Sequence, residues 1–231
     1  LLLALILVPL HLPAAVKGEA HANTKPLKLK GDLSVQMVAG IDRFLMRETM
    51  EAAKRRPTFW KRDYRANDTY HFSVLKNRER FRYCIGAVDE LKPIKGLEYI
   101  SITDRSSLLY KDATMTIHSV RWAVLHGVHG EGLLIQPQGA IRARVVAIPD
   151  ADQTPEQLAG IVPGIEPKAQ FARRLAAAGC QVVVPTLISR NDEHSGNARV
   201  RFTNQPHREW VYRQAFQMGR HIIGYEVLKV Q

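Results

Sequence analysis

The second half of the sequence predicts an α/β fold, in which an antiparallel hairpin precedes parallel strands joined by crossover helices. From residue 113 onward, short apolar runs alternate with segments that carry helix-capping signals, an order typical of parallel sheets. The runs at 145–148 and 182–184 are continuously aliphatic, as in strands buried on both faces. Residues 114–135 are rich in β-branched side chains around a glycine-punctuated centre, which indicates the hairpin.

The first 22 residues have the pattern of a secretory signal peptide. The chain opens on Leu1, residues 1–10 are almost wholly aliphatic, and a small-residue stretch ends on Ala20-His21-Ala22. The apolar run is shorter than the roughly 20 residues needed to span a bilayer. We therefore expect cleavage near Ala22 and export to the periplasm or beyond, without stable membrane insertion. The alternative is a retained N-terminal anchor. Because an initiator Met and a positive n-region are missing, we expect this leader to be truncated.

Residues 23–112 are expected to form an accessory α+β region that precedes the main domain. Its polar, Lys-rich start leads to Asp32 or Ser34, either of which can cap a helix with apolar residues at helical spacing as far as Pro57. The runs 71–75, 79–85 and 97–103 predict short strands or irregular structure, separated by Gly86, Pro93 and Gly96. We find no motif here that carries chemistry.

Residues 113–231 are expected to form the start of a larger α/β domain. Strand 114–125 leads through a turn at 126–132 into the run 133–135, and strand 143–148 follows. Thr154, Pro155 and Gln157 form a capping box that begins a helix, and a second helix at 169–178 ends at Gly179. Strand 181–184 precedes a polar loop at 189–203, and one long helix runs from near Pro206.

The composition excludes several classes of protein. With 45% hydrophobic residues the chain can bury a real core, and disorder is not indicated. The net charge of +11 is spread over scattered Lys and Arg residues, so we read it as favouring solubility and expect no nucleic-acid partner. Cys84 and Cys180 lie far apart in sequence and are expected to be two separate buried thiols, although export would permit a disulfide.

Two loops can carry chemistry, because ligands of open α/β sheets bind beyond the carboxyl ends of the strands. These are residues 149–153 and 186–197. The first enters a capped helix, so the backbone N–H groups of Ala151, Asp152 and Gln153 are candidates for stabilising an oxyanion. The Asp side chains of this loop could instead bind a cation or form a turn that caps the helix.

Other polar groups favour ordinary structural explanations. His194 follows Asp192 and Glu193 in the second loop, which we interpret as solvated rather than as a metal site. His126 and His129 lie in the glycine-rich turn of the hairpin, and the turn accounts for the glycines. The sequence contains neither a P-loop nor G-x-G-x-x-G, so no cofactor is expected. It also contains no G-x-S-x-G, the nucleophile motif of many ester hydrolases.

The order of elements resembles the start of an α/β-hydrolase. Several stretches resemble a bacterial secreted group described as acetyl-xylan-esterase-like or dienelactone-hydrolase-like: Val-Val-Ala-Ile-Pro-Asp-Ala-Asp at 145–152, Gln-Phe-Ala-Arg-Arg-Leu at 170–175, Gly-Cys-Gln-Val-Val-Val-Pro-Thr-Leu at 179–187, and His-Arg-Glu at 207–209 through Gly-Arg-His-Ile-Ile-Gly-Tyr-Glu at 219–226. The resemblance covers residues 114–231.

This resemblance implies an exported serine carboxylic-ester hydrolase that acts on a small-molecule or carbohydrate ester. In that superfamily the nucleophile follows the next strand, and the acid and the histidine come later. All three are therefore expected beyond Gln231, so no catalytic residue is assigned in this chain and the chain itself is expected to be inactive. The resemblance places one oxyanion N–H at Ala151 or Asp152, although the usual His-Gly of that loop is Asp150-Ala151 here.

Two other functions stay open at this stage. One is a non-enzymatic secreted binding module that contacts acidic glycans or nucleic acid through basic residues, with steeply salt-dependent binding. The other is a pseudo-hydrolase with the same fold and no catalytic triad. Whatever the function, a sheet that stops at its second parallel strand would expose an open edge, so we expect the isolated chain to aggregate or to be degraded.

Overall fold

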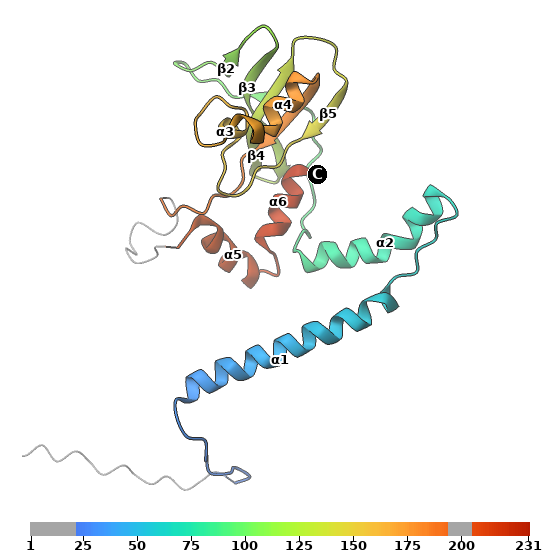
Figure 1. Cartoon of the computed structure of the whole chain (residues 1–231), viewed down its shortest axis with the longest axis vertical. Coiled ribbons are helices and arrows are strands. Elements are labelled where there is room, and N and C mark those ends of the chain that lie inside the picture. Colours follow the sequence, from blue (N-terminus) through green and yellow to red (C-terminus); the bar gives the residue numbers. More distant parts are fainter. Residues whose placement is uncertain (1–21, 194–204) are drawn as a thin grey trace, which may run out of the picture. The chain divides into compact units, whose positions relative to one another are not determined.

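The computed structural model describes residues 22–193 and 205–231, and the chain divides into two units, residues 1–60 and 61–231 (Figure 1). The expected signal peptide at 1–22 lies, apart from Ala22, outside the described residues, as does His194 of the expected polar loop.

The first unit contains one long helix, as the sequence predicts. Helix α1 spans Leu33–Arg55, and the Asp32 side chain caps it by accepting hydrogen bonds from the backbone N–H groups of Ser34 and Val35. A short 3-10 turn, Arg56–Phe59, follows with Pro57 near its start. No residue of α1 is buried. Among the described residues, no helix is both long and apolar enough to cross a membrane.

The second unit begins with a helix where strands were expected. Helix α2 spans Asn67–Cys84, so the prediction of strands or irregular structure at 71–75 and 79–85 is wrong. No Gly or Pro interrupts the stretch from Asn67 to Cys84, and short apolar runs alone cannot distinguish helix from strand. Gly86, in the left-handed region with φ +70°, lies just after the helix and is its stop signal rather than a break between strands.

The sheet of the second unit has six strands and is mostly antiparallel. Its strands are β1 Glu98–Tyr99, β2 Leu108–Lys111, β3 Met115–Leu125, β4 Val128–Pro137, β5 Ala143–Val146 and β6 Cys180–Pro185. Their order is β1-β3-β4-β6-β5, with β2 also paired to β3. The predicted hairpin is β3–β4, and the predicted parallel pair is β5–β6, with Val145 opposite Val182. Over residues 22–193 and 205–231, parallel pairing is confined to these two strands.

Side chains that alternate along the strands point to opposite faces of the sheet and belong to two hydrophobic clusters. Ile117, Leu133 and Val182 point to the face covered by α3 (Pro155–Leu158) and α4 (Phe171–Ala177). Val120 and Leu134 point to the opposite face, where Leu228 of α6 (Ile222–Val230) packs. Since both faces are covered, the sheet forms the middle of three layers (Figure 1).

The glycines of the hairpin have three different structural roles. The turn consists of His126 and Gly127 (φ +73°) and is tighter than the seven-residue turn that the sequence suggests. Gly130 and Gly132 lie inside β4, so the interpretation that the turn accounts for all of them is wrong. A Cβ at Gly130 would meet the Trp122 ring at 2.5 Å, and one at Gly132 would lie 2.1 Å from the Val184 carbonyl oxygen.

The remaining helices agree with the sequence except at one break. The capping box of α3 forms as expected, and Gly179 follows α4 with φ +91°. The single long helix expected from Pro206 is instead two helices, α5 His207–Gln217 and α6. Gly219 lies between them with φ +67°, and the His221 side chain caps α6 by accepting from the Ile223 N–H. These two residues end one helix and begin the next.

Two further expectations concern connectivity. The predicted boundary between an accessory region at 23–112 and a domain at 113–231 remains a prediction, although β1 and β2 lie before it and pair with β3 after it. Cys84 and Cys180 are separate free thiols, as expected. Neither is buried as expected, however: Cys84 is exposed and Cys180 is half-buried.

Candidate functional site

The two loops singled out in the sequence meet at the carboxyl ends of β5 and β6. Residues 151–156 of the first loop and its helix, together with Thr186, Leu187 and residues 189–191 of the second, line one pocket of about 370 Å³. The parallel pairing of β5 with β6 brings the loops together, because both strands end at the same edge of the sheet. All three oxyanion candidates, Ala151, Asp152 and Gln153, line this pocket.

The first loop forms a tight turn, in which the backbone N–H of Gln153 differs from those of Ala151 and Asp152 in its hydrogen bonding. The Gln153 N–H donates to the Asp150 carbonyl oxygen at 3.0 Å, and the Gln153 side-chain oxygen accepts from the Asp150 N–H at 3.2 Å. The Gln153 N–H is therefore already engaged. Within the described part of the chain, the N–H groups of Ala151 and Asp152 have no hydrogen-bond acceptor. Two adjacent backbone donors are thus available at the pocket.

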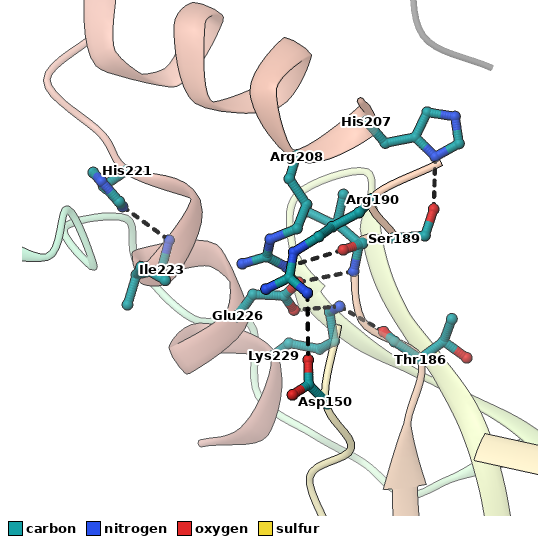
Figure 2. A network of polar contacts seen from close by, with 11 residues as sticks. Asp150, Thr186, Ser189, Arg190, His207, Arg208, His221, Ile223, Glu226 and Lys229 are labelled. Atoms are coloured by element: carbon teal, nitrogen blue, oxygen red, sulfur yellow. Dashed lines mark hydrogen bonds and ion pairs between the residues drawn. The ribbon is translucent and has the colours of Figure 1, made fainter. Parts of the chain in front are cut away.

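One arginine of the second loop joins the two loops. The Arg190 guanidinium contacts the Asp152 carboxylate. It also lies 3.6 Å from an oxygen of Asp150 (Figure 2). The two Asp side chains are therefore paired with an arginine from across the pocket. The alternatives considered from the sequence were a bound cation and a turn that caps the helix, and neither included this ion pair. These side chains are more than half exposed, so each ion pair contributes little to stability by itself.

A hydroxyl–imidazole pair in the second loop was not foreseen from the sequence. Ser189 Oγ lies 2.8 Å from His207 Nδ1, and the hydroxyl also donates to the Asn191 side-chain oxygen. The His207 N–H donates to the Asn191 carbonyl oxygen at 2.8 Å. The tautomer of His207 decides which of the two groups donates. The contact links the loop to the start of α5.

Ser189 and His207 lie 18 positions apart in the sequence, so no local pattern predicts that they pair. The two residues meet only because the start of α5 lies against the loop after β6. This is a tertiary contact that the local sequence does not reveal.

The histidines of the hairpin line a different and larger pocket. This pocket, of about 600 Å³, lies at the β3–β4 turn, and its walls include His126, His129, Ile188 and Tyr225. An ion pair between Asp89 and Arg220 (2.7 Å) also borders it, and the Arg220 guanidinium lowers the pKa of the Asp89 carboxyl. Over residues 22–193 and 205–231, no group of three or more His, Cys, Asp or Glu residues is arranged to hold a metal ion.

Comparison with known proteins gives weak, partial similarity to esterases. No protein-family profile and no curated protein sequence matches the chain. Among solved structures, a protein of Bacteroides fragilis provisionally described as an acetyl xylan esterase matches with a TM-score of 0.44 and 17% identity, over 68% of this chain and 41% of that one. Acetyl xylan esterase 1 of a Thermoanaerobacterium species matches with a TM-score of 0.29 and 9% identity, over 63% and 44%. This chain thus spans less than half the length of these two structures.

Proposed function

We propose that this chain supplies the oxyanion-binding side of an exported serine carboxylic-ester hydrolase. The proposal depends chiefly on the two adjacent N–H groups of Ala151 and Asp152, which line a pocket at the end of a parallel strand and lack an acceptor among the described residues. Preorganised backbone donors of this kind stabilise the negative charge that develops on an ester carbonyl oxygen during acyl transfer.

The connectivity around these donors supports the proposal. Counted from the hairpin, β5 is the third strand, and the loop after it enters a capped helix, α3. In α/β-hydrolases one oxyanion N–H comes from the loop between the third strand and the first helix. The position of Ala151 and Asp152 agrees with that arrangement.

The nucleophile in this proposal comes from outside these 231 residues, because their sequence contains no G-x-S-x-G. Strand β5 lies at an open edge of the sheet, where a further strand can pair. The ester itself would be a small molecule or an acylated carbohydrate. Attack by a serine with histidine as general base, through an acyl-enzyme, is the chemistry that an oxyanion hole serves.

Removal of a single backbone donor tests the proposal. In the turn formed by residues 150–153, Ala151 occupies the second position, where proline is favoured. Ala151→Pro would therefore keep the turn and delete one N–H. In the natural gene product that contains this chain, we expect kcat for 4-nitrophenyl acetate and for an acetylated xylo-oligosaccharide to fall about 10²–10³-fold.

The matched control is Ala151→Ser, which keeps the N–H and should retain most of the activity. An unchanged kcat in Ala151→Pro would show that the Ala151 N–H is not the oxyanion donor, and the Asp152 N–H would remain the candidate. If the natural gene product hydrolyses neither ester and does not react with a serine-directed phosphonate, the proposed function is wrong.

A further inference from the structure

Three charged side chains form a poorly exposed cluster beside the candidate site. Arg208 of α5 and Glu226 and Lys229 of α6 are only 20%, 12% and 14% exposed at their side chains. Glu226 links the other two: one carboxylate oxygen lies 3.3 Å from Arg208 Nη1, and the other lies 2.7 Å from Lys229 Nζ. Two cations around one carboxylate satisfy charges that would be costly to bury alone.

All three side chains also bind the backbone of the loop after β6 (Figure 2). Glu226 accepts from the Ile188 N–H at 2.8 Å, and Arg208 donates to the Ile188 carbonyl oxygen at 2.9 Å. Lys229 donates to the Thr186 carbonyl oxygen at 2.7 Å. The cluster therefore holds the N–H and C=O groups of this loop in the way that a neighbouring strand would.

The sheet itself does not hold this loop. The Thr186 N–H donates to the Glu131 carbonyl oxygen, which is the last bond between β4 and this segment among the described residues. Beyond Thr186, side chains of α5 and α6 bind the N–H and the carbonyl oxygen of Ile188, which lies just before Ser189 and Arg190. Further along the loop, the His207 N–H binds the Asn191 carbonyl oxygen.

Contacts continue from this loop to the oxyanion turn. Arg190 pairs with Asp150 and Asp152, the two residues on either side of Ala151. Polar contacts therefore join Glu226 to Ile188 and join Arg190 to the turn that carries the two available N–H groups, and two peptide bonds connect Ile188 to Arg190 (Figure 2).

We propose that Glu226 is a positioning residue for the candidate site: its carboxylate fixes the loop after β6, and that loop, through Arg190, fixes the oxyanion turn. The functional meaning of this role rests on the proposed ester hydrolase. Glu226 is the key member of the cluster because it is the acceptor shared by Arg208, Lys229 and the Ile188 N–H. Its removal leaves the Ile188 N–H without its acceptor and the two cations without their carboxylate partner, although each cation keeps a backbone carbonyl oxygen.

Hydrogen exchange of the full chain, followed by mass spectrometry of peptides, tests this role without any ester turnover. In Glu226→Ala we expect residues 186–190 to exchange about tenfold faster or more, because a poorly exposed N–H loses its acceptor. Residues 150–154 should also exchange several-fold faster, while β6 residues 181–184 stay within about twofold of wild type.

Three further variants separate a positioning role from general stabilisation. Glu226→Gln keeps an oxygen for the Ile188 N–H and should restore most of the protection at 186–190. Arg190→Ala should speed exchange at 150–154 alone, because it removes only the ion pairs of Arg190 with Asp150 and Asp152. The matched control is Glu209→Ala, which breaks the exposed Glu209–Arg213 pair on α5 and should change neither loop.

Two results would overturn the proposal. One is equal acceleration of 186–190 and of β6 in Glu226→Ala, which indicates a role in overall stability only. The other is faster exchange at 186–190 with no change at 150–154 in either Glu226→Ala or Arg190→Ala. If Glu226→Ala does not fold, Glu226→Gln and Arg190→Ala decide the question. Failure of the Ala151→Pro test leaves these exchange results intact, so the two proposals fail separately.

Discussion

At the scale of single residues, the Asp112 side chain anchors the start of β3 through several hydrogen bonds. One of its oxygens accepts from the Thr114 hydroxyl and N–H, both at 2.7 Å, and from the Met115 N–H at 2.9 Å. The other accepts from the Tyr110 hydroxyl and lies 3.4 Å from Arg173. These donors, the Thr114 hydroxyl first, hold the pKa of Asp112 well below its ordinary value.

This shift predicts a specific acid sensitivity. A carboxyl group with a lower pKa in the folded state stabilises the fold above its unfolded pKa, about 3.9, and this stabilisation is lost as the pH falls below that value. We expect the melting temperature of the chain to drop between about pH 4 and pH 2, and Asp112→Asn to lower it at pH 7 and flatten this drop. Thermal melts at a series of pH values measure both effects.

The control for this measurement is Asp104→Asn, which changes an exposed carboxylate in the loop between β1 and β2. It should shift neither the melting temperature at pH 7 nor the acid dependence. An acid profile that Asp112→Asn leaves unchanged would show that other carboxylates dominate the acid response.

At the scale of elements, the accuracy of the sequence-based predictions followed the strength of local signals. The helix capped by Asp32, the capping box at Thr154 and the glycine stop at Gly179 are local, and all three formed as predicted. The prediction of strands at 71–75 and 79–85 was wrong because a short apolar run is compatible with a strand or with a helix. Here the uninterrupted helix α2 forms instead. The helix break at Gly219 was hidden by apolar residues whose helical spacing continues across it.

Close packing of β4 against β6 gives a prediction at this scale. A Cβ on Gly132 would lie 2.1 Å from the Val184 carbonyl oxygen, and backbone atoms of a central strand cannot move aside cheaply. Gly132→Ala should therefore destabilise the sheet by about 1–3 kcal/mol, as overpacking of a core does. Urea unfolding monitored by circular dichroism measures the loss.

Gly139→Ala is the matched control, because nothing lies within 4 Å of a Cβ built there. It should change the free energy of unfolding by no more than about 0.5 kcal/mol. Equal stability of the two variants would mean that β4 and β6 can separate to admit a methyl group.

At the scale of the whole molecule, the sequence identified the loops of the candidate site but not its interactions. Alternation of strands and helices was enough to place 149–153 and 186–197 at one edge of the sheet, and both loops line one pocket. That Gln153 uses its own N–H within the turn, and that Arg190 bridges to Asp150 and Asp152, could not be predicted. Such contacts depend on distances between loops, and sequence spacing carries no information on them.

The open edge of the sheet also determines how the whole chain should behave in solution. Strand β5 lies at the edge of the sheet, and Val146 and Ile148, at and just after its end, are 48% and 52% exposed. An edge strand that exposes aliphatic side chains and unpaired backbone groups promotes pairing between chains. We therefore expect this chain to self-associate with rising concentration, in sedimentation velocity and in light scattering.

A charge on that edge should suppress the association, since lysine is a common device for protecting edge strands. Val146→Lys is expected to shift the chain toward monomer without loss of helix or sheet content. Val128→Lys is the matched control: Val128 is 49% exposed but lies at the hairpin turn, where it pairs with Leu125 of β3 and is remote from β5, so its change should leave association as it is. Monomeric behaviour of the unchanged chain at high concentration, or equal effects of the two lysines, would show that the edge of β5 does not drive self-association.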